Sequence, residues 1–234
     1  MSRTILITGA SSSFGQELIS RLPNDVKIIA HSRSPLPKIN DGDARIINII
    51  SDFSNPDFLT DFDGKVNFAE IDEVVHFAAA DLRMQKFVFS NTEQLVFDYK
   101  LNFLSIFSLL VKVLATLKNS PRQIRAVVMI TDMIRAPKNG EISYITSKYA
   151  LLGLVKSLLS EYSGNELRLN AVSPSLVDTR FVKIPEFLKT DISDKHAMKR
   201  HCTISEVVDA IEFLLSPKSS FINGQNISIN GGVK

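Results

Sequence analysis

Tyr144 and Lys148 lie four residues apart, a spacing that brings two side chains to one face of an α-helix. A tyrosine phenol has a pKa of about 10, and an adjacent ammonium group favours its ionised form. The pair therefore predicts a general acid/base that interconverts a carbonyl and an alcohol near neutral pH. Taken by itself, such a pair is more often an ordinary feature of an exposed helix surface.

A second group of residues, near the N-terminus, is suited to a phosphate. An apolar run over residues 4–7 leads into a turn with Gly9 and Gly15 and with serines at positions 11 to 13. Glycine in such a turn lets the backbone approach a pyrophosphate, and the following helix supplies free N–H groups and the positive end of its dipole. An ordinary strand-to-helix turn is the alternative for this segment.

Short apolar runs alternate with longer amphipathic segments along the whole chain. The predicted strands cover residues 4–8, 27–31, 45–49, 73–77, 126–130, 168–173 and 226–229, and the predicted helices cover residues 15–22, 92–117, 143–163 and 205–215. Nearly uniformly apolar strands indicate a sheet covered on both faces, and their alternation with helices indicates parallel pairing. We therefore expect an α/β fold with a doubly wound parallel sheet, in one domain over residues 1–234. Residues 175–203 have weak periodicity, which is typical of a substrate loop.

The glycine turn and the later Tyr-x-x-x-Lys helix together resemble the short-chain dehydrogenase/reductase family in its single-domain form. Further matches follow in the family's order along the chain. They are Asp52 after the third strand, residues 76–80 in place of Asn-Asn-Ala-Gly, Asn102, residues 170–175 in place of Asn-x-x-x-Pro-Gly, Asp178, Thr179, and residues 222–225 and 230–232. The resemblance covers essentially the whole chain. It implies a Rossmann-like sheet of about seven strands with helices on both faces.

The resemblance also implies roles for four side chains. Tyr144 would give its proton to the developing alkoxide, while Lys148 would lower the pKa of the tyrosine and bind the nicotinamide ribose. Thr131 would orient the substrate oxygen by a hydrogen bond. Asn102 would hold a water molecule that links Lys148 to solvent, and a helix asparagine bonded to backbone is the alternative for this residue.

Two alignments are open for the residue that orients the substrate oxygen. Thr131 precedes Tyr144 by the thirteen residues that are usual in the family, whereas alignment on the strand residues 127–130 places Asp132 there instead. A threonine hydroxyl donates a hydrogen bond, but an ionised aspartate only accepts one. We favour Thr131 on this chemistry and keep Asp132 as the alternative.

Arg33 follows the second predicted strand, where NADP-using members of the family carry an arginine for the 2′-phosphate. No Asp or Glu lies between Asp25 and Asp41 to bind the ribose hydroxyl of NAD. NADP(H) is therefore the preferred cofactor and NAD(H) the alternative, while a merely solvated arginine would favour neither. The residues that the resemblance places around the cofactor are Gly9, Ser11, Ser12, Phe14, Arg33, Asp52, Ala78, Ala79, Tyr144, Lys148, Pro174, Val177 and Thr179.

Three positions depart from the family's glycine pattern. Ser13, Ala79 and Ser175 stand where the family carries glycine. A positive φ at any of them would strain a residue that has a β-carbon. We expect cofactor binding to be retained, with a lower affinity than is usual in the family.

Charge, cysteine and histidine usage exclude several classes of protein. Lys and Arg number 27 against 25 Asp and Glu, and the net charge of +2 gives no basis for general nucleic-acid binding. The single cysteine, Cys202, excludes an internal disulfide framework and multi-cysteine metal sites. The four histidines lack metal-ligand spacing, so no metal centre is expected, and His76 is expected to be a hydrogen-bonded structural residue.

The sequence shows no targeting segment and no apolar run of the roughly 20 residues that a membrane span needs. We therefore expect a soluble, cytoplasmic protein without membrane binding, acting on a small carbonyl or alcohol substrate. Cations in residues 81–87, 133–139 and 175–203 raise the hypothesis of an anionic substrate, with scattered surface charge as the alternative.

Because two-fold oligomers are the commonest, a homodimer or homotetramer is expected. Two other functions stay open at this point. One is an epimerase or dehydratase of nucleotide sugars, and the other is a non-catalytic NADP-binding protein.

Overall fold

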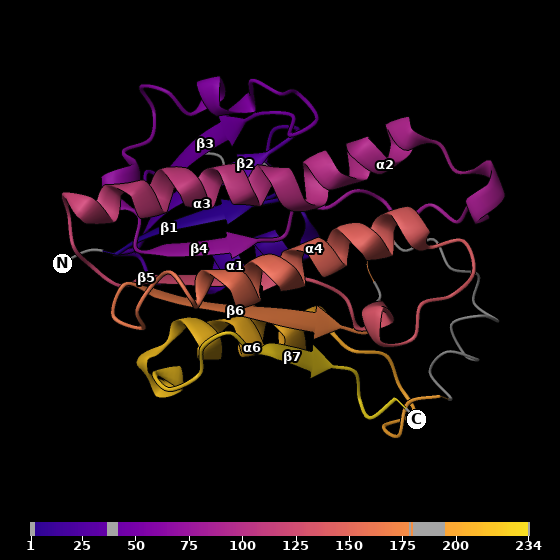
Figure 1. Cartoon of the computed structure of the whole chain (residues 1–234). Coiled ribbons are helices and arrows are strands. Elements are labelled where there is room, and N and C mark those ends of the chain that lie inside the picture. The colour runs from indigo at the N-terminus through magenta and orange to yellow at the C-terminus, as the bar shows by residue number, and fades with distance from the viewer. Residues whose placement is uncertain (1–2, 37–41, 178, 180–194, 234) are drawn as a thin grey trace.

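The computed structural model describes residues 3–36, 42–177, 179 and 195–233. Within these residues, one sheet is built from the strands drawn as arrows in Figure 1: β1 (Thr4–Thr8), β2 (Lys27–Ser32), β3 (Ile46–Ile50), β4 (Glu73–His76), β5 (Ile124–Met129), β6 (Leu167–Pro174) and β7 (Asn226–Ile229). Each predicted strand is present, with ends within two residues of those expected. Of the predicted substrate loop, residues 178 and 180–194 lie outside the described part of the chain.

The strands are all parallel and follow the order β3-β2-β1-β4-β5-β6-β7. Every residue of β1, β4 and β6 is buried, as expected for strands that are covered on both faces. The order reverses between β1 and β4, where Thr8 pairs with His76, so the loops after these two strands diverge from a topological switch point. The predicted doubly wound, Rossmann-like fold is confirmed.

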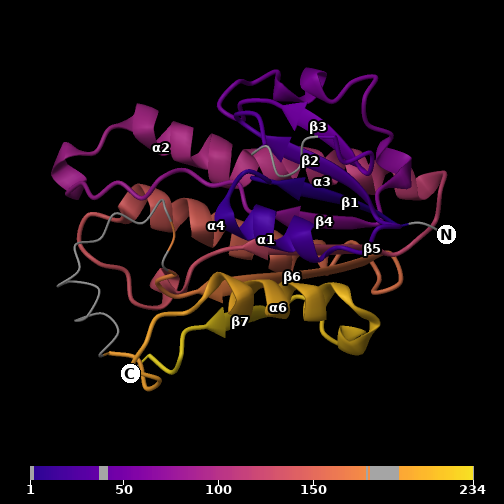
Figure 2. The same ribbon diagram turned by 180° about the vertical axis from the view of Figure 1, so that it is seen from behind.

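Helices cover both faces of the sheet. In Figure 1, α3 (Ser105–Ala115) and α4 (Ile142–Leu158) lie in front of it, and Figure 2 shows α1 (Ser13–Arg21) and α6 (Ile204–Leu215) on the other side. Ile106 and Leu151 belong to one buried apolar cluster, and Leu18 and Val208 belong to a second. The sheet therefore separates two apolar cores, each closed by one layer of helices.

A π-helical turn at Lys100–Leu104 divides the single helix that was predicted over residues 92–117 into α2 (Thr92–Tyr99) and α3. π-Helical turns are rare in proteins, and those that occur often lie at functional sites. This one carries Asn102. Among the described residues, one helical segment, Thr92–Lys118, is long and apolar enough by length and composition to cross a membrane. Ile106 and Leu109 on its inner face are fully buried, so it packs as a core helix.

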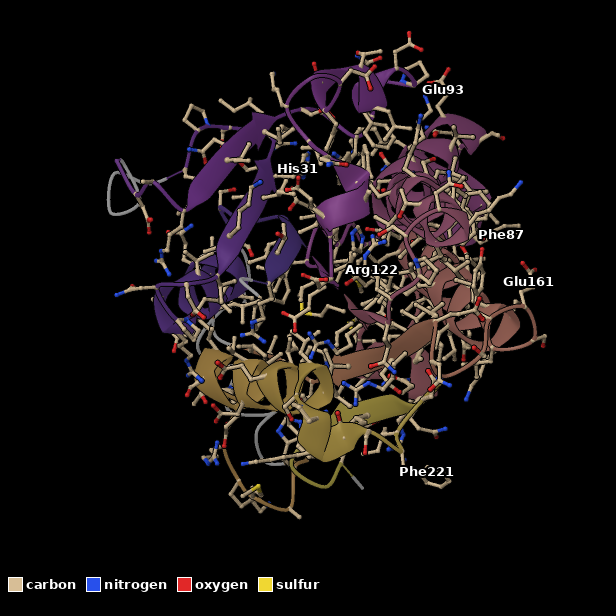
Figure 3. All side chains as sticks on the ribbon, turned by 90° about the vertical axis from the view of Figure 1, so that its left-hand side faces the viewer. His31, Phe87, Glu93, Arg122, Glu161 and Phe221 are labelled. Atoms are coloured by element: carbon tan, nitrogen blue, oxygen red, sulfur yellow. The ribbon has the colours of Figure 1, made fainter. Side chains whose placement is uncertain are left out.

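Arg122 fastens the amino end of the sheet, the end seen in Figure 3. Its guanidinium donates to the backbone carbonyls of Phe68 and Ile71, both at 3.0 Å, and to the hydroxyl of Thr116 at 3.1 Å. These bonds tie the segment before β5 to the segment before β4 and to the end of α3. The central strands are thus held at the edge opposite to the predicted site.

Candidate active site

Tyr144 and Lys148 lie in the first half of α4, against the end of β5. Their spacing places them on one face of the helix, with the Lys148 ammonium nitrogen 5.5 Å from the centre of the Tyr144 ring. Lys148 is 1% exposed, and its Nζ donates a hydrogen bond of 3.1 Å to the carbonyl of Met129, the last residue of β5. The structure thus brings the predicted acid/base pair to the carboxyl edge of the sheet.

Burial changes the pKa of both groups. It lowers the pKa of Lys148 to about 7, because the ammonium loses hydration on entering the core. It raises the pKa of Tyr144, and the carboxylates of Asp98 and Glu141 raise it further. Lys148 was expected to lower the pKa of the phenol, but burial and the two carboxylates act in the opposite direction. A phenol that stays protonated at neutral pH is suited to giving a proton away.

Asn102 joins three elements through its side chain. It is fully buried, its Oδ1 accepts a hydrogen bond of 2.8 Å from the amide of Ala80, and its Nδ2 donates one of 2.7 Å to the hydroxyl of Ser147. The π-turn is thereby fastened both to the loop after β4 and to α4, one residue before Lys148. The side-chain amide is thus used within the chain, and the water-holding role of Asn102 stays a prediction.

Thr131 and Asp132 follow the end of β5 and are both buried. The Thr131 hydroxyl caps a short 3-10 turn, Asp132–Arg135, by accepting from the amide two residues on at 3.3 Å. One carboxylate oxygen of Asp132 accepts from the Asn230 side chain at 3.0 Å, and the other has no partner among the described residues. The hydroxyl of Tyr149 donates to the Ile134 carbonyl at 2.6 Å and so fastens this turn to α4. Both alignments of the oxygen-orienting residue remain predictions.

Two glycines in the turn after β1 are required by packing. Gly9 has a φ of +66°, and a β-carbon there would lie 2.7 Å from the amide nitrogen of Ala78. A β-carbon on Gly15 would lie 2.7 Å from the carbonyl oxygen of Ala10. The loops that leave the switch point therefore approach each other more closely than side chains allow.

The first turn of α1 offers the donors that a pyrophosphate needs. Ser12 caps this helix by accepting from the amide of Gly15 at 3.1 Å, and Ser11 precedes it. No hydrogen bond joins the amides of Ser13 and Phe14 to any described residue, so both donors remain at the positive end of the helix dipole. These observations fit the phosphates of a dinucleotide.

The replaced glycines carry no backbone strain. Among the described non-glycine residues, only Lys199 has a positive φ. Ser13, Ala79 and Ser175 therefore adopt conformations that are open to any residue, and the strain considered from the sequence does not arise there.

Arg33 and Asp52 mark the expected adenosine end of the site, beyond β2 and β3. Arg33 is exposed. Burial opposes ionisation of Asp52, but hydrogen bonds to Ser54 and the charge of Arg33 leave its pKa below the usual range. His31 stacks on Phe53 with ring centres 3.8 Å apart, and burial lowers its pKa to about 4. A neutral His31 cannot assist Arg33 by charge.

The remaining predicted cofactor residues lie along the same edge of the sheet. Ala78 is half-buried beside Gly9, and Ala79 is exposed one residue further on. Pro174 ends β6, Val177 pairs with Cys202 and is buried, and Thr179 is half-buried.

Buried carboxylates near Tyr144 are the main feature that the sequence did not reveal. Asp98 is 2% exposed and accepts hydrogen bonds from Ser143 and Gln94. Its position one helical turn before Asn102 was the available signal, because that spacing puts both on one helix face. In the described part of the chain no group of three or more His, Cys, Asp or Glu residues could hold a metal.

The amino-acid sequence matches a family model and several curated proteins. A family model described as enoyl-(acyl carrier protein) reductase matches residues 40–234. The 3-oxoacyl-[acyl-carrier-protein] reductase FabG of Buchnera aphidicola is 33% identical over 135 residues, which cover 57% of this chain and 55% of the relative. FabG of Thermotoga maritima is 34% identical over 110 residues, covering 46% and 45%. The chain thus spans about half the length of the curated relatives it matches.

Solved structures match over nearly the whole chain. A 4-hydroxyisoleucine dehydrogenase complexed with NADH superposes with a TM-score of 0.87 at 22% identity, covering 98% of each chain. ElxO with NADP bound superposes with a TM-score of 0.85 at 23% identity, covering 99% of this chain and 98% of that one. At this level of identity the likeness shows a shared fold.

Proposed function

The chain belongs to the short-chain dehydrogenase/reductase family, and from this premise we propose that it is an NADP(H)-dependent oxidoreductase that interconverts a carbonyl and a secondary alcohol. One observation carries the proposal. A protonated Tyr144 and a buried Lys148 lie together at the end of β5, and Ser147 ties their helix to Asn102. This is the edge of the sheet to which the glycine turn also leads.

In the proposed reaction, each of the four residues does separate work. When bound, the nicotinamide supplies or accepts the hydride. Tyr144 gives its proton to the substrate oxygen during reduction, and the hydroxyl of Thr131 donates a hydrogen bond to the same oxygen. Lys148 replaces the proton of Tyr144 and binds the ribose. The Asn102 carbonyl holds the water from which Lys148 is reprotonated.

NADP(H) is the proposed cofactor because of Arg33. A guanidinium pairs with a 2′-phosphate through charge-assisted, directional hydrogen bonds. Arg33 is exposed directly after β2, so its guanidinium is accessible to a cofactor. One similar structure carries NADP and another carries NADH, so these likenesses favour neither cofactor. NAD(H) stays the alternative.

The proposal extends to the setting of the enzyme. We propose a single dinucleotide-binding and catalytic domain over residues 1–234, acting in the cytoplasm on a small carbonyl or alcohol compound. Leu104, Phe107 and Val111 are large exposed apolar side chains at the start of α3 and along it, and they support a homodimer or homotetramer.

The test is a cofactor titration followed by a screen of ketones with NADPH and of alcohols with NADP. We expect binding, net NADPH consumption with at least one ketone, and a loss of about a hundredfold or more in kcat for Tyr144→Phe. Tyr162→Phe, beyond the end of α4, is the matched control and should keep full activity. Binding without turnover, unaffected by Tyr144→Phe, would contradict the proposal and favour a non-catalytic NADP-binding protein.

A second candidate has one observation in its favour. The segment His76-Phe77-Ala78-Ala79 replaces the Asn-Asn-Ala-Gly of the usual dehydrogenase pattern, and it resembles nucleotide-sugar epimerases and dehydratases. Such an enzyme would change a nucleotide sugar without net consumption of NADPH. Product analysis by NMR after incubation with nucleotide sugars separates the two candidates.

A further inference from the structure

His76 ends β4 beside the proposed proton-transfer residues, and the proposed function gives it no role. The side chain is fully buried. Its Nδ1 lies 2.7 Å from the hydroxyl oxygen of Thr8 across the switch point, so the ring is held on that side. Its Nε2 makes no hydrogen bond of ordinary geometry to a described residue, although the backbone of Asn102 lies near enough to act on the ring. A buried polar atom in this state commonly binds an internal water.

The groups that face His76 come from four elements. Thr8 on β1 bonds its Nδ1, and the backbone of Asn102 in the π-turn favours the protonated form of the ring. The ammonium of Lys148 on α4 disfavours that form by its charge, as a protonated His31 on β2 would. The carboxylates of the site, Asp98 and Glu141, act on Tyr144.

The charge of this buried cluster is carried by Lys148. Burial, ahead of the charge of Lys148, holds the pKa of His76 well below its usual range, so the imidazole is neutral. A neutral imidazole has one donor and one acceptor nitrogen, so its Nε2 can either donate a hydrogen bond to a water or accept one from it. His76 is therefore a neutral hydrogen-bonding group beside the ammonium that has to be reprotonated.

We propose that the Nε2 of His76, the main-chain carbonyl of Asn102 and the ammonium of Lys148 together hold one water molecule, through which Lys148 recovers the proton that it passes to Tyr144. This inference rests on the proposed function and adds His76 to it as a positioning residue. In each reduction the water gives one proton to Lys148 and receives one from solvent, so the water itself is not consumed. Thr8 fixes the ring from the opposite side.

This arrangement belongs to the present chain because of the residue type at position 76. The resemblance places asparagine there, and the imidazole reaches further from β4 than a shorter amide side chain does. His76→Asn would therefore keep a polar group but withdraw it from the water. His76→Gln, with a longer side chain, should restore the contact, whereas His76→Leu should remove it.

The first test needs no turnover. The protein is labelled with 15N-histidine and followed by NMR from pH 5.5 to 8.5, with the His76 signals assigned through His76→Gln. We expect the ring to stay neutral while its Nε2 signal shifts with a midpoint of about 7, the pKa of Lys148. In Lys148→Met the shift should disappear. No response near that pH, or the same response in Lys148→Met, would overturn the proposal.

A second measurement on the wild-type protein covers the case in which Lys148→Met does not fold. A long-lived water beside His76 gives a nuclear Overhauser contact between the ring protons and water. We expect this contact, and a spectrum without it would overturn the proposal.

Kinetics then separate this inference from the proposed function. We expect His76→Leu to lower kcat roughly tenfold and to raise the solvent isotope effect, with the KM for NADPH within about twofold of wild type. His76→Gln should recover most of the loss. If the wild-type protein turns over and His76→Leu has the same kinetics, the role of His76 is wrong and the proposed function stands. If the wild-type protein binds NADPH without any turnover, the proposed function itself is wrong.

Discussion

The side-chain amide of Asn102 donates a hydrogen bond of 2.7 Å to the hydroxyl of Ser147, a residue 45 positions later in the chain. Both side chains are fully buried. The bond joins the π-turn to the middle of the Tyr-x-x-x-Lys segment, so the packing of two helices sets the position of the proposed proton-transfer pair.

Removing either partner of this bond should destabilise the protein. Asn102→Ala leaves the buried amide of Ala80 without its acceptor and removes the hydrogen bond that the Ser147 hydroxyl accepts, at a cost of about 1 to 3 kcal/mol. Ser147→Ala should cost less, and the double variant should show a coupling of about 0.5 to 1.5 kcal/mol in denaturant unfolding. Thr146→Ala, the neighbouring position, is the control and should change stability by less than about 0.5 kcal/mol. Additive effects would show that the bond is not formed in solution.

Lys148 should make stability depend on pH. Its pKa of about 7 in the folded protein lies below the ordinary lysine value of 10.5, so between these values the unfolded chain binds more protons. The free energy of unfolding should therefore rise with pH from about 7, and by up to a few kcal/mol before pH 10.

Lys148→Met should remove this rise in stability. The measurement is the free energy of urea unfolding of wild type and of Lys148→Met at several pH values from 6 to 9. Lys156→Met, further along α4, is the control and should keep the wild-type slope. An identical pH dependence in wild type and Lys148→Met would show that the ammonium is not desolvated.

Two glycine substitutions should have effects of opposite sign. Gly9→Ala places a β-carbon 2.7 Å from the Ala78 amide at a φ of +66°, so it should cost about 2 to 5 kcal/mol. Gly153→Ala, inside α4 with open space around it, should instead stabilise by about 0.5 to 1 kcal/mol. Thermal unfolding of both variants measures the difference, and a neutral Gly9→Ala would contradict the close approach of the two loops.

Arg33 should decide between the two dinucleotides. Arg33→Ala removes charge-assisted hydrogen bonds to a 2′-phosphate and should weaken NADPH binding about tenfold to a hundredfold. The Kd for NADH should change by less than about twofold, because that cofactor lacks the phosphate. Calorimetric titration with both dinucleotides gives the two values. Equal losses for both would assign Arg33 a structural role.

Salt should distinguish an anionic substrate from a neutral one. A cationic entrance would accelerate anionic ketones, and added salt would reduce their kcat/KM while leaving neutral ketones unchanged. Arg83 already contacts the Phe97 ring and the Gln94 side chain, so it is partly committed elsewhere. Kinetics insensitive to salt for every substrate would end the anionic hypothesis.

The sheet could be predicted from the sequence because strands buried on both faces leave a local signature. Runs such as residues 4–8 and 168–173 are apolar at nearly every position, and the helices between them repeat with the helical period. The turn after the first strand could be predicted for a similar reason, since Gly9 is required where two loops meet.

Properties that arise from contacts between distant segments could not be predicted in this way. The π-turn at Lys100–Leu104 has no local signal, and the predicted helix ran through it unbroken. The direction of the pKa shift of Tyr144 was also missed, because it depends on burial and on Asp98, which reaches the site by the packing of α2 on α4.

The sequence by itself therefore determined the order of strands and helices, the glycine turn, and the candidate residues Tyr144 and Lys148, because periodicity and residue spacing are local. Only the tertiary structure decided that His76 lies beside Thr8 within the electrostatic influence of Lys148, and that the Lys148 ammonium is buried. Burial and the electrostatic environment are properties of the assembled core, in which segments far apart in the chain exclude water from one another.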